Sequence, residues 1–351
     1  MNLKRSGPGL ALAAAALFGL SAPAAKLLAG TVDPWLLAGL LYLGSGIGLG
    51  LYRVARRLLG RVGSEAPLRR QDLSWLAGAI AAGGIMGPVL LMYGLAAGTA
   101  VQSSLLLNLE GVFTALIAWS VFRESFDARI AIGMAAIAGG ATVLAWRPAE
   151  WLALDGSALL VAGACLAWAI DNNLTRRVSG GDPLQIAALK GIVAGSINVL
   201  VALVQRAPWP APTATLAAGI VGFLGYGTSL VLFVLALRLL GAARSGAYFS
   251  TAPFVGAIAG AVVLHEPLTW QTFVAGVLMG TGVWLHLTER HDHEHRHEAL
   301  EHTHAHVHDE HHQHPHAPGA PPGEPHSHVH LHEPLRHSHP HFPDLHHRHH
   351  H

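Results

Sequence analysis

The recurrence of apolar segments long enough to cross a bilayer limits what this chain can fold into. A helix of about 20 residues spans the ~30 Å hydrocarbon core. Hydrophobic residues make up 51% of the chain and charged residues only 12%, as in polytopic membrane proteins. The sequence therefore predicts an all-α membrane protein with ten transmembrane helices, near residues 8–29, 33–53, 73–96, 100–121, 128–146, 157–175, 184–205, 214–238, 243–264 and 269–287.

Basic residues divide unevenly between the two sides of this arrangement. With the N-terminus in the cytoplasm, the loops on that side carry most of the arginines: Arg53, Arg56, Arg57, Arg61, Arg69, Arg70, Arg123, Arg129, Arg176, Arg177, Arg238 and Arg244. The opposite loops carry Arg147 and Arg206, with Lys26 at the end of the first window. This asymmetry follows the positive-inside rule. It places both termini in the cytoplasm and the body in a bacterial-type inner membrane.

Two pairs of segments indicate an internal repeat. Asp33-Pro34 precedes the second window and Asp182-Pro183 the seventh, an offset of 149 residues. The stretch LLLNLEGVFTALIAWSVFRE (105–124) is echoed by AYFSTAPFVGAIAGAVVLHE (247–266) at an offset of 142. Glu110 has no acidic counterpart, because position 252 is alanine.

An odd number of windows in each half gives the halves opposite orientations. The predicted architecture is therefore two inverted five-helix repeats, residues 1–148 and 149–288, followed by a polar tail at 289–351. Lys4 and Arg5 before an apolar run resemble a signal peptide, but the repeat needs this first span, so we expect it to be retained. Inverted repeats of this kind are typical of alternating-access transporters.

The end of each half carries a more specific pattern, FRESFDARIAIGMAAIAGG in the first and LHEPLTWQTFVAGVLMGTG in the second. With the ten windows, these segments resemble the EamA family of the drug/metabolite transporter superfamily over residues 8–288. The resemblance implies a secondary transporter of small metabolites, amino acids, nucleotide sugars or drugs, and many members are exporters. Glu110 and the histidine-rich tail depart from a generic member.

Glu110 lies near the middle of the fourth window and is the leading candidate site residue. A carboxylate at mid-membrane costs about 2.5–3.5 kcal/mol on insertion scales, which favours a functional role in proton coupling or cation binding. Thr114, at i+4, shares its helix face, whereas Asn108, at i−2, points elsewhere. The alternative is a structural acid that is paired with Lys190 or protonated.

A second polar group joins the sixth and seventh windows. Asp171 and Asn172 end the sixth window, and Lys190 lies about two turns into the seventh. Lys190 can pair with Asp171 as a gate or as a static ion pair. If it pairs with Glu110 instead, protonation of that acid would release it, and the sequence leaves both arrangements open.

Helix-breaking residues interrupt three windows: Gly84-x-x-Gly87-Pro88 in the third, Gly222-x-x-Gly225-Tyr226-Gly227 in the eighth and Pro253 in the ninth. Transporters expose backbone carbonyls to substrate at such positions. Tyr226 and Pro253 are therefore candidate cavity residues, although a simple kink is the commoner outcome.

The tail holds 24 of the 26 histidines, in runs that alternate with acidic, small or proline residues. Imidazole is a good ligand for nickel, cobalt, copper and zinc. We expect the tail to be disordered without metal and to bind such ions in several overlapping sets. The candidate ligands are His291, His293, His295, His297, His302, His304, His306, His308, His311, His312, His326, His328, His330, His332, His337, His339 and His341.

Other classes of function lack support in the sequence. It has no P-loop or nucleophile elbow, so we do not expect an enzyme or a required cofactor. It has no basic block with interleaved aromatics, so nucleic acid is not an expected partner. The prediction is a secondary-active exporter of a small metabolite in the lipid bilayer, with a homodimer as one assembly. The alternatives are a nickel, cobalt or zinc exporter and a membrane-anchored metal buffer or sensor.

Overall fold

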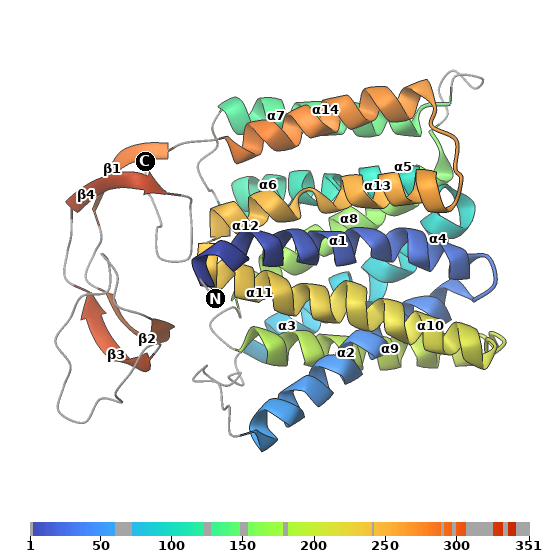
Figure 1. The fold of residues 1–351 in the computed structure, drawn as a ribbon, viewed down its shortest axis with the longest axis horizontal. Coiled ribbons are helices and arrows are strands. Elements are labelled where there is room, and N and C mark those ends of the chain that lie inside the picture. The colour runs from blue at the N-terminus through green and yellow to red at the C-terminus, as the bar shows by residue number, and fades with distance from the viewer. Residues whose placement is uncertain are drawn as a thin grey trace.

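The computed structural model describes residues 3–59, 72–122, 128–147, 154–177, 182–240, 242–288, 291–296, 300–306, 326–332 and 336–341. Up to residue 288 its regular elements are helices, gathered in one bundle (Figure 1). In chain order they are α1 Leu3–Ala29, α2 Pro34–Leu58, α3 Leu73–Ala79, η2 Ile80–Met86, α4 Gly87–Ala97, α5 Ala100–Leu106, α6 Leu109–Phe122, α7 Ala128–Ala145, α8 Gly156–Arg177, α9 Pro183–Val204, α10 Pro212–Gly222, η3 Phe223–Thr228, α11 Ser229–Leu240, α12 Ala242–Phe249, α13 Ala252–Val263 and α14 Trp270–Leu287.

By length and composition, eight helical segments of the described chain can cross a membrane: Gly7–Ala29, Pro34–Leu58, Leu73–Ala97, Ala100–Val121, Ala128–Ala145, Gly156–Thr175, Leu184–Val204 and Pro212–Ala236. The ninth expected window is divided between α12 and the shorter apolar helix α13. The tenth forms α14. These helices support the prediction of an all-helical, multi-pass membrane body.

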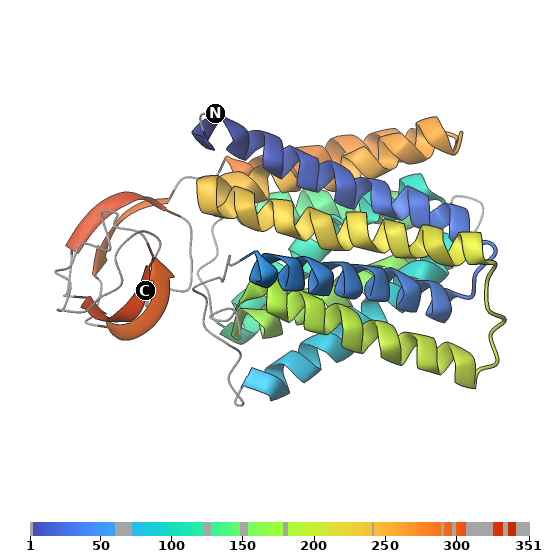
Figure 2. The same ribbon diagram turned by 60° about the horizontal axis from the view of Figure 1, so that its bottom comes forward.

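The most extensive helix–helix contacts join segments that are far apart in the chain. Helix α2 packs along α9, and α7 packs along α14, and both pairs run side by side in Figures 1 and 2. Helix α1 packs on α11 and α13, while α8 packs on α4 and α6. Small residues permit this: a Cβ on Gly191 would lie 2.7 Å from the Cα of Gly46 in α2. Gly276 of α14, by contrast, has nothing within 4 Å of such a Cβ in the described chain.

Two of the expected spans are broken inside the bundle. Helix α5 ends at Leu106 and α6 begins at Leu109, while α12 ends at Phe249 and α13 begins at Ala252. Asn108 Nδ2 donates to the Leu105 carbonyl (2.8 Å), and Thr251 Oγ1 donates to the Tyr248 carbonyl (2.6 Å). In both breaks a polar side chain thus bonds back three residues and satisfies a carbonyl at the end of the helix.

Two further segments are wound as π-helices. Segment η2 lies between α3 and α4, and η3 lies between α10 and α11. They fall where the sequence predicted interruptions by Gly84–Pro88 and by Gly222–Gly227. A π-turn shifts the backbone hydrogen-bond register and is frequent at functional sites.

The described residues of the tail form four strands, which Figure 1 shows apart from the helices. Strand β1 (His291–Arg296) pairs antiparallel with β4 (Arg336–His341), and β2 (Leu300–His306) pairs antiparallel with β3 (His326–His332). The sequence predicted a tail without regular structure, whereas the structure describes these segments as strands. The physical reason is that alternating histidines have the two-residue period of a strand. His297, His308, His311 and His312 lie outside the described residues.

Candidate functional site

Glu110 lies directly after the first break, in the first turn of α6. It is the eleventh residue of the apolar segment Ala100–Val121, and is therefore near mid-membrane. Its side chain is half-buried. The exposed backbone N–H groups at a helix N-terminus favour a negative charge, so the break itself helps to hold this carboxylate.

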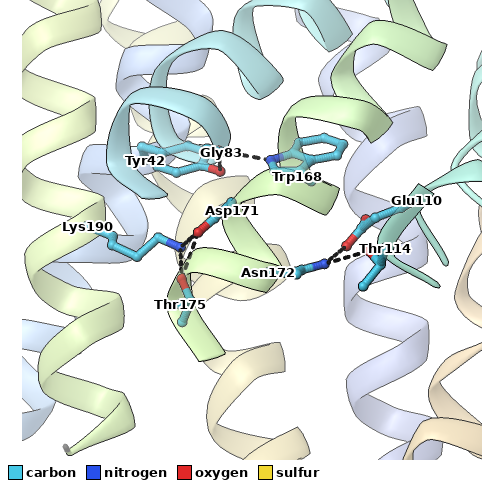
Figure 3. Close-up of polar contacts among 9 residues, drawn as sticks. All are labelled: Tyr42, Gly83, Glu110, Thr114, Trp168, Asp171, Asn172, Thr175 and Lys190. Atoms are coloured by element: carbon cyan, nitrogen blue, oxygen red, sulfur yellow. Dashed lines mark hydrogen bonds and ion pairs between the residues drawn. The ribbon is translucent and has the colours of Figure 1, made fainter. Parts of the chain in front are cut away.

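Asn172 of α8 is the hydrogen-bond partner of Glu110 (Figure 3). Its Nδ2 lies 2.8 Å from Glu110 Oε1 and 3.5 Å from Thr114 Oγ1. Thr114 therefore shares the face of Glu110, as the helical spacing predicted. Asn108 is buried elsewhere, with Nδ2 bonded to Leu105 and 3.9 Å from the Met279 sulfur.

Lys190 of α9 pairs with Asp171 and not with Glu110, which decides between the two arrangements that the sequence left open. Its Nζ lies 2.5 and 2.6 Å from the two Asp171 carboxylate oxygens. Thr175 completes the group, because its hydroxyl donates to Asp171 (2.8 Å) and lies 3.4 Å from Lys190 Nζ. Asp171 is 6% exposed, so this pair is largely removed from solvent.

The π-helical segment η2 adjoins this ion pair. The Gly83 carbonyl accepts hydrogen bonds from the Tyr42 hydroxyl (2.8 Å) and from Trp168 Nε1 (2.9 Å). A Cβ on Gly83 would overlap the Asp171 carboxyl group, so glycine is required there. Figure 3 shows Trp168 on α8 one turn before Asn172. Sequence reasoning missed Tyr42 and Trp168. The four-residue spacing from Trp168 to Asn172 was the one available signal.

Aromatic rings extend the site toward η3. The Tyr42 and Tyr226 ring centroids are 5.7 Å apart, and Phe18 lies 6.0 Å from Tyr226. Phe249, which ends α12 at the second break, lies 5.4 Å from Phe18. These rings connect Tyr226 to the Glu110 region through Tyr42 and η2. Pro253 is in the first turn of α13, which packs on α1 and α5.

Asn172 and the large hydrophobic side chains that α8 exposes lie on different faces of this helix. Leu166 and Ile170 are exposed large hydrophobic residues, as on a lipid-facing surface. Asn172 is also exposed. At 100° per residue it lies roughly 160° around the helix from Ile170. Its amide therefore lies on a different face of α8 from Ile170. A carboxylate held there by one amide can exchange a proton or bind a cationic group.

Charged side chains stabilise the end of the bundle where α1 ends and α5 begins. We call this the far end, because it lies at the opposite end of α8 from Asn172. Lys26 Nζ donates to the carbonyls of Leu95 (2.5 Å) and Gly98 (2.6 Å), at the C-terminus of α4. The Glu266 carboxylate accepts from the backbone N–H groups of Ala100 and Val101, both at 2.8 Å, at the N-terminus of α5. Each charge has the sign that its helix end prefers. Together they hold the α4–α5 turn.

Asp155, just before α8, extends this polar network outside the apolar segments. It accepts hydrogen bonds from Ser157 Oγ (2.9 Å), Arg147 (3.2 Å) and Gln102 (3.3 Å). Burial raises the pKa of this carboxyl group, but the hydrogen bonds from Ser157, Gln102 and Arg147 outweigh burial. The net effect lowers its pKa below the ordinary value.

Metal ligands do not gather in the part of the chain that the structure describes with side chains. There, no group of three or more histidine, cysteine, aspartate or glutamate side chains is placed to hold an ion. The side chains of the tail histidines lie outside this part.

Comparisons with known proteins agree with this membrane body. Residues 5–146 and 156–288 each match the EamA-like transporter family, and the chain belongs to that family. An "Uncharacterized transporter" of Methanothermobacter thermautotrophicus is 28% identical over 288 residues, covering 78% of this chain and 84% of that protein. A solved structure, titled only "Crystal structure of protein", has a similar fold, with a TM-score of 0.58 and 18% identity over 80% of this chain and 95% of the other. The protein is therefore a multi-pass membrane transporter of this family.

Proposed function

We propose that the protein is a secondary-active exporter of a small metabolite that works by alternating access. In this proposal ten spans form two inverted five-helix halves, with the cargo bound between them. Three paired features support it: two family matches, two broken spans and two π-helical segments. Transporters of this type place binding sites where helices are discontinuous near the bilayer midplane.

The observation that carries the proposal is the Glu110 carboxylate, held by Asn172 at the first break. An ionised carboxylate only accepts hydrogen bonds, whereas a protonated one also donates. Proton uptake would therefore change the contacts among Glu110, Asn172 and Thr114. Because α6 and α8 carry these groups, the protonation state of Glu110 can bias how the two helices sit together. The Asp171–Lys190 pair keeps α8 attached to α9 throughout.

The direction of access in this proposal is inferred from a comparison of the two ends of the bundle. At the far end, Lys26 and Glu266 hold the α4–α5 turn, and α5 packs on α13. At the near end, which is the end that carries Asn172, the Asn172 side chain is exposed. There α6 packs on α8 and α7, whereas α12 packs on α1 and α11. We assign the near end to the cytoplasm of a bacterial-type inner membrane, since it carries most of the arginines. In this conformation cargo would enter from the cytoplasm.

The proposal is tested in cells that express the wild-type protein or Glu110→Gln. The measurements are small metabolites in the medium and in the cells, by mass spectrometry, and total nickel, cobalt, zinc and copper, by elemental analysis. Asp155→Asn is the matched control, because it makes the same carboxylate-to-amide change outside the apolar segments. We expect one metabolite class to accumulate in the medium with the wild type and Asp155→Asn, and not with Glu110→Gln. Equal release by all three would overturn the role of Glu110.

The second candidate is a divalent-metal exporter whose tail collects nickel, cobalt or zinc, favoured by the histidine runs. Its signature in the same cells is a fall in one metal that depends on Glu110. A third reading, from another class, is a metal buffer or sensor anchored by the body. It requires metal to rise with the tail present regardless of Glu110, and to return to baseline when residues 291–351 are deleted.

A further inference from the structure

The strand register of the tail places histidine opposite histidine at three positions in each strand pair, while His332 lies opposite Leu300. In the β1–β4 pair the opposed residues are His291 and His341, His293 and His339, and His295 and His337. In the β2–β3 pair they are His302 and His330, His304 and His328, and His306 and His326. Each pairing thus aligns three histidines with three, although the paired strands are separated by up to 39 intervening residues.

Strand geometry gives this register a chemical consequence. Alternate residues of a strand share one face, so the three pairs of each ribbon lie on the same face. Opposed Cα atoms are about 4.5–5.5 Å apart, and next-but-one residues along a strand about 6.5–7 Å apart. A zinc–imidazole bond measures roughly 2.0–2.1 Å, so two neighbouring pairs can supply four nitrogen ligands to one ion.

We propose that the tail forms two separate histidine ladders, β1–β4 and β2–β3, and that each binds divalent transition-metal ions through adjacent cross-strand pairs. The inference rests on metal binding by the tail, and it adds which histidines act together. An isolated two-stranded ribbon is marginal in water. Metal binding therefore stabilises each pairing, because the ion contributes its binding free energy only when both strands are present.

The ladders predict a pattern of losses that an unstructured chelator does not share. If ligands are paired, removing His302, His304 and His306 should release the same ions as removing His326, His328 and His330. Combining the two triple substitutions should then add nothing further. A third variant affects both ladders, so its losses of bound metal should sum. It lacks His302, His304 and His306 of one ladder and His291, His293 and His295 of the other.

The measurement is zinc retained per chain after dialysis, by elemental analysis of the full-length protein with each set changed to alanine. We expect the losses of zinc from two triple substitutions in the same ladder not to add, and the losses from triple substitutions in different ladders to add. Loss in proportion to the number of histidines removed, whatever their pairing, would overturn the ladders while leaving tail binding intact. Absence of retained zinc in the wild type would overturn tail binding as well.

A distance measurement tests the pairing directly. In a Cys165→Ala background, Thr303→Cys and Val329→Cys label two opposed residues of β2 and β3. The control pair, Thr303→Cys with Ser338→Cys, joins strands of different ribbons. Added zinc should give the opposed pair a short, narrow spin-label distance and leave the control pair broad. A similar response of both pairs, or none in the opposed pair, would contradict the proposed register.

Discussion

The two broken spans share a backbone design and differ in chemistry. Each break lies between two short helices, and each is closed by a polar side chain that bonds to the carbonyl three residues earlier. After the first break comes Glu110, half-buried and bonded to Asn172. After the second comes Ala252, which is 1% exposed. The break is thus a property of the scaffold, whereas the acid belongs to one half only.

The helix that faces each break differs in the same way. At the offset of 149 that aligns Asp33 with Asp182, Asp171 corresponds to Ala22 and Asn172 to Pro23. Helix α8 therefore offers polar partners to the first break, and α1 offers a close apolar surface to the second. A Cβ on Gly19 would overlap the Ala252 carbonyl, so the space there is filled. In the function that we propose, the first break serves ion or cargo chemistry and the second serves packing.

The largest effect is expected from placing an acid at the second break. Ala252→Glu would bury a charge without a partner and overfill the contact with α1. We expect a loss of about 3.5–6.5 kcal/mol of stability, combining roughly 2.5–3.5 kcal/mol for the charge with roughly 1–3 kcal/mol for overpacking. Thermal unfolding in detergent measures it, with Ala252→Ser as the small polar control. If Ala252→Glu were as stable as the wild type, the second break would accept an acid, which would contradict the difference between the two breaks.

The Asp171–Lys190 pair tests whether α8 is specialised for the first break. Lys190→Met leaves the buried Asp171 carboxylate unpaired and should lower stability by about 3 kcal/mol. Adding Asp171→Asn should recover part of that loss, since the unpaired charge is removed. Thermal unfolding of both single variants and the double variant checks this. Losses that simply add would mean that the two residues do not act as a pair.

Glu110→Gln should affect transport more than folding. The charged hydrogen bond from Asn172 is worth about 1.5–3 kcal/mol, which corresponds to roughly 10–150-fold in rate. We expect the initial rate of metabolite release to fall by that factor, and unfolding to change by less than about 1 kcal/mol. Glu110→Asp, which keeps the acid, should retain intermediate activity. A large loss of stability without a specific transport defect would make Glu110 a structural acid.

The smallest effect is expected outside both breaks, at Asp155. Its pKa is lowered in the folded state, so the ionised form stabilises the fold above the unfolded-state pKa of about 3.9. That stabilisation disappears as the pH falls through the folded-state pKa. Asp155→Asn should therefore destabilise by less than about 1 kcal/mol at pH 7 and not at all well below pH 3. Unfolding followed as a function of pH measures it, and a pH-independent difference would contradict it.

Sequence reasoning placed site residues correctly where their positions depend on short-range helix geometry. Thr114 shares the face of Glu110 because four residues make about one helical turn, and Asn108 turns away because two residues do not. The glycine and proline clusters marked both π-helical segments for a similar reason. The partner of Lys190 stayed open, because two carboxylates lay at plausible depths. Only the tertiary arrangement, in which η2 packs on both α8 and α9, selects Asp171.

Residues that act through the backbone left little trace in the sequence. Tyr42 and Trp168 meet at the Gly83 carbonyl, and Asn198 bonds to the Gly84 carbonyl (3.1 Å). A carbonyl is common to every residue, so the sequence does not identify the acceptor. The strands of the tail were missed for another reason. Composition predicted disorder, although the alternation of histidine with other residues has the two-residue period of a strand.

The sequence by itself determined a membrane-embedded helical body, its family and the depth of Glu110, because hydrophobic length and helical period are local properties. Tertiary structure decided which groups meet. Asn172 reaches Glu110, Lys190 reaches Asp171 and the aromatic rings join η2 to η3. These contacts depend on the rotation and depth of each helix against its neighbours. Those quantities are set by close packing of side chains from distant segments, and no periodicity in the chain fixes them.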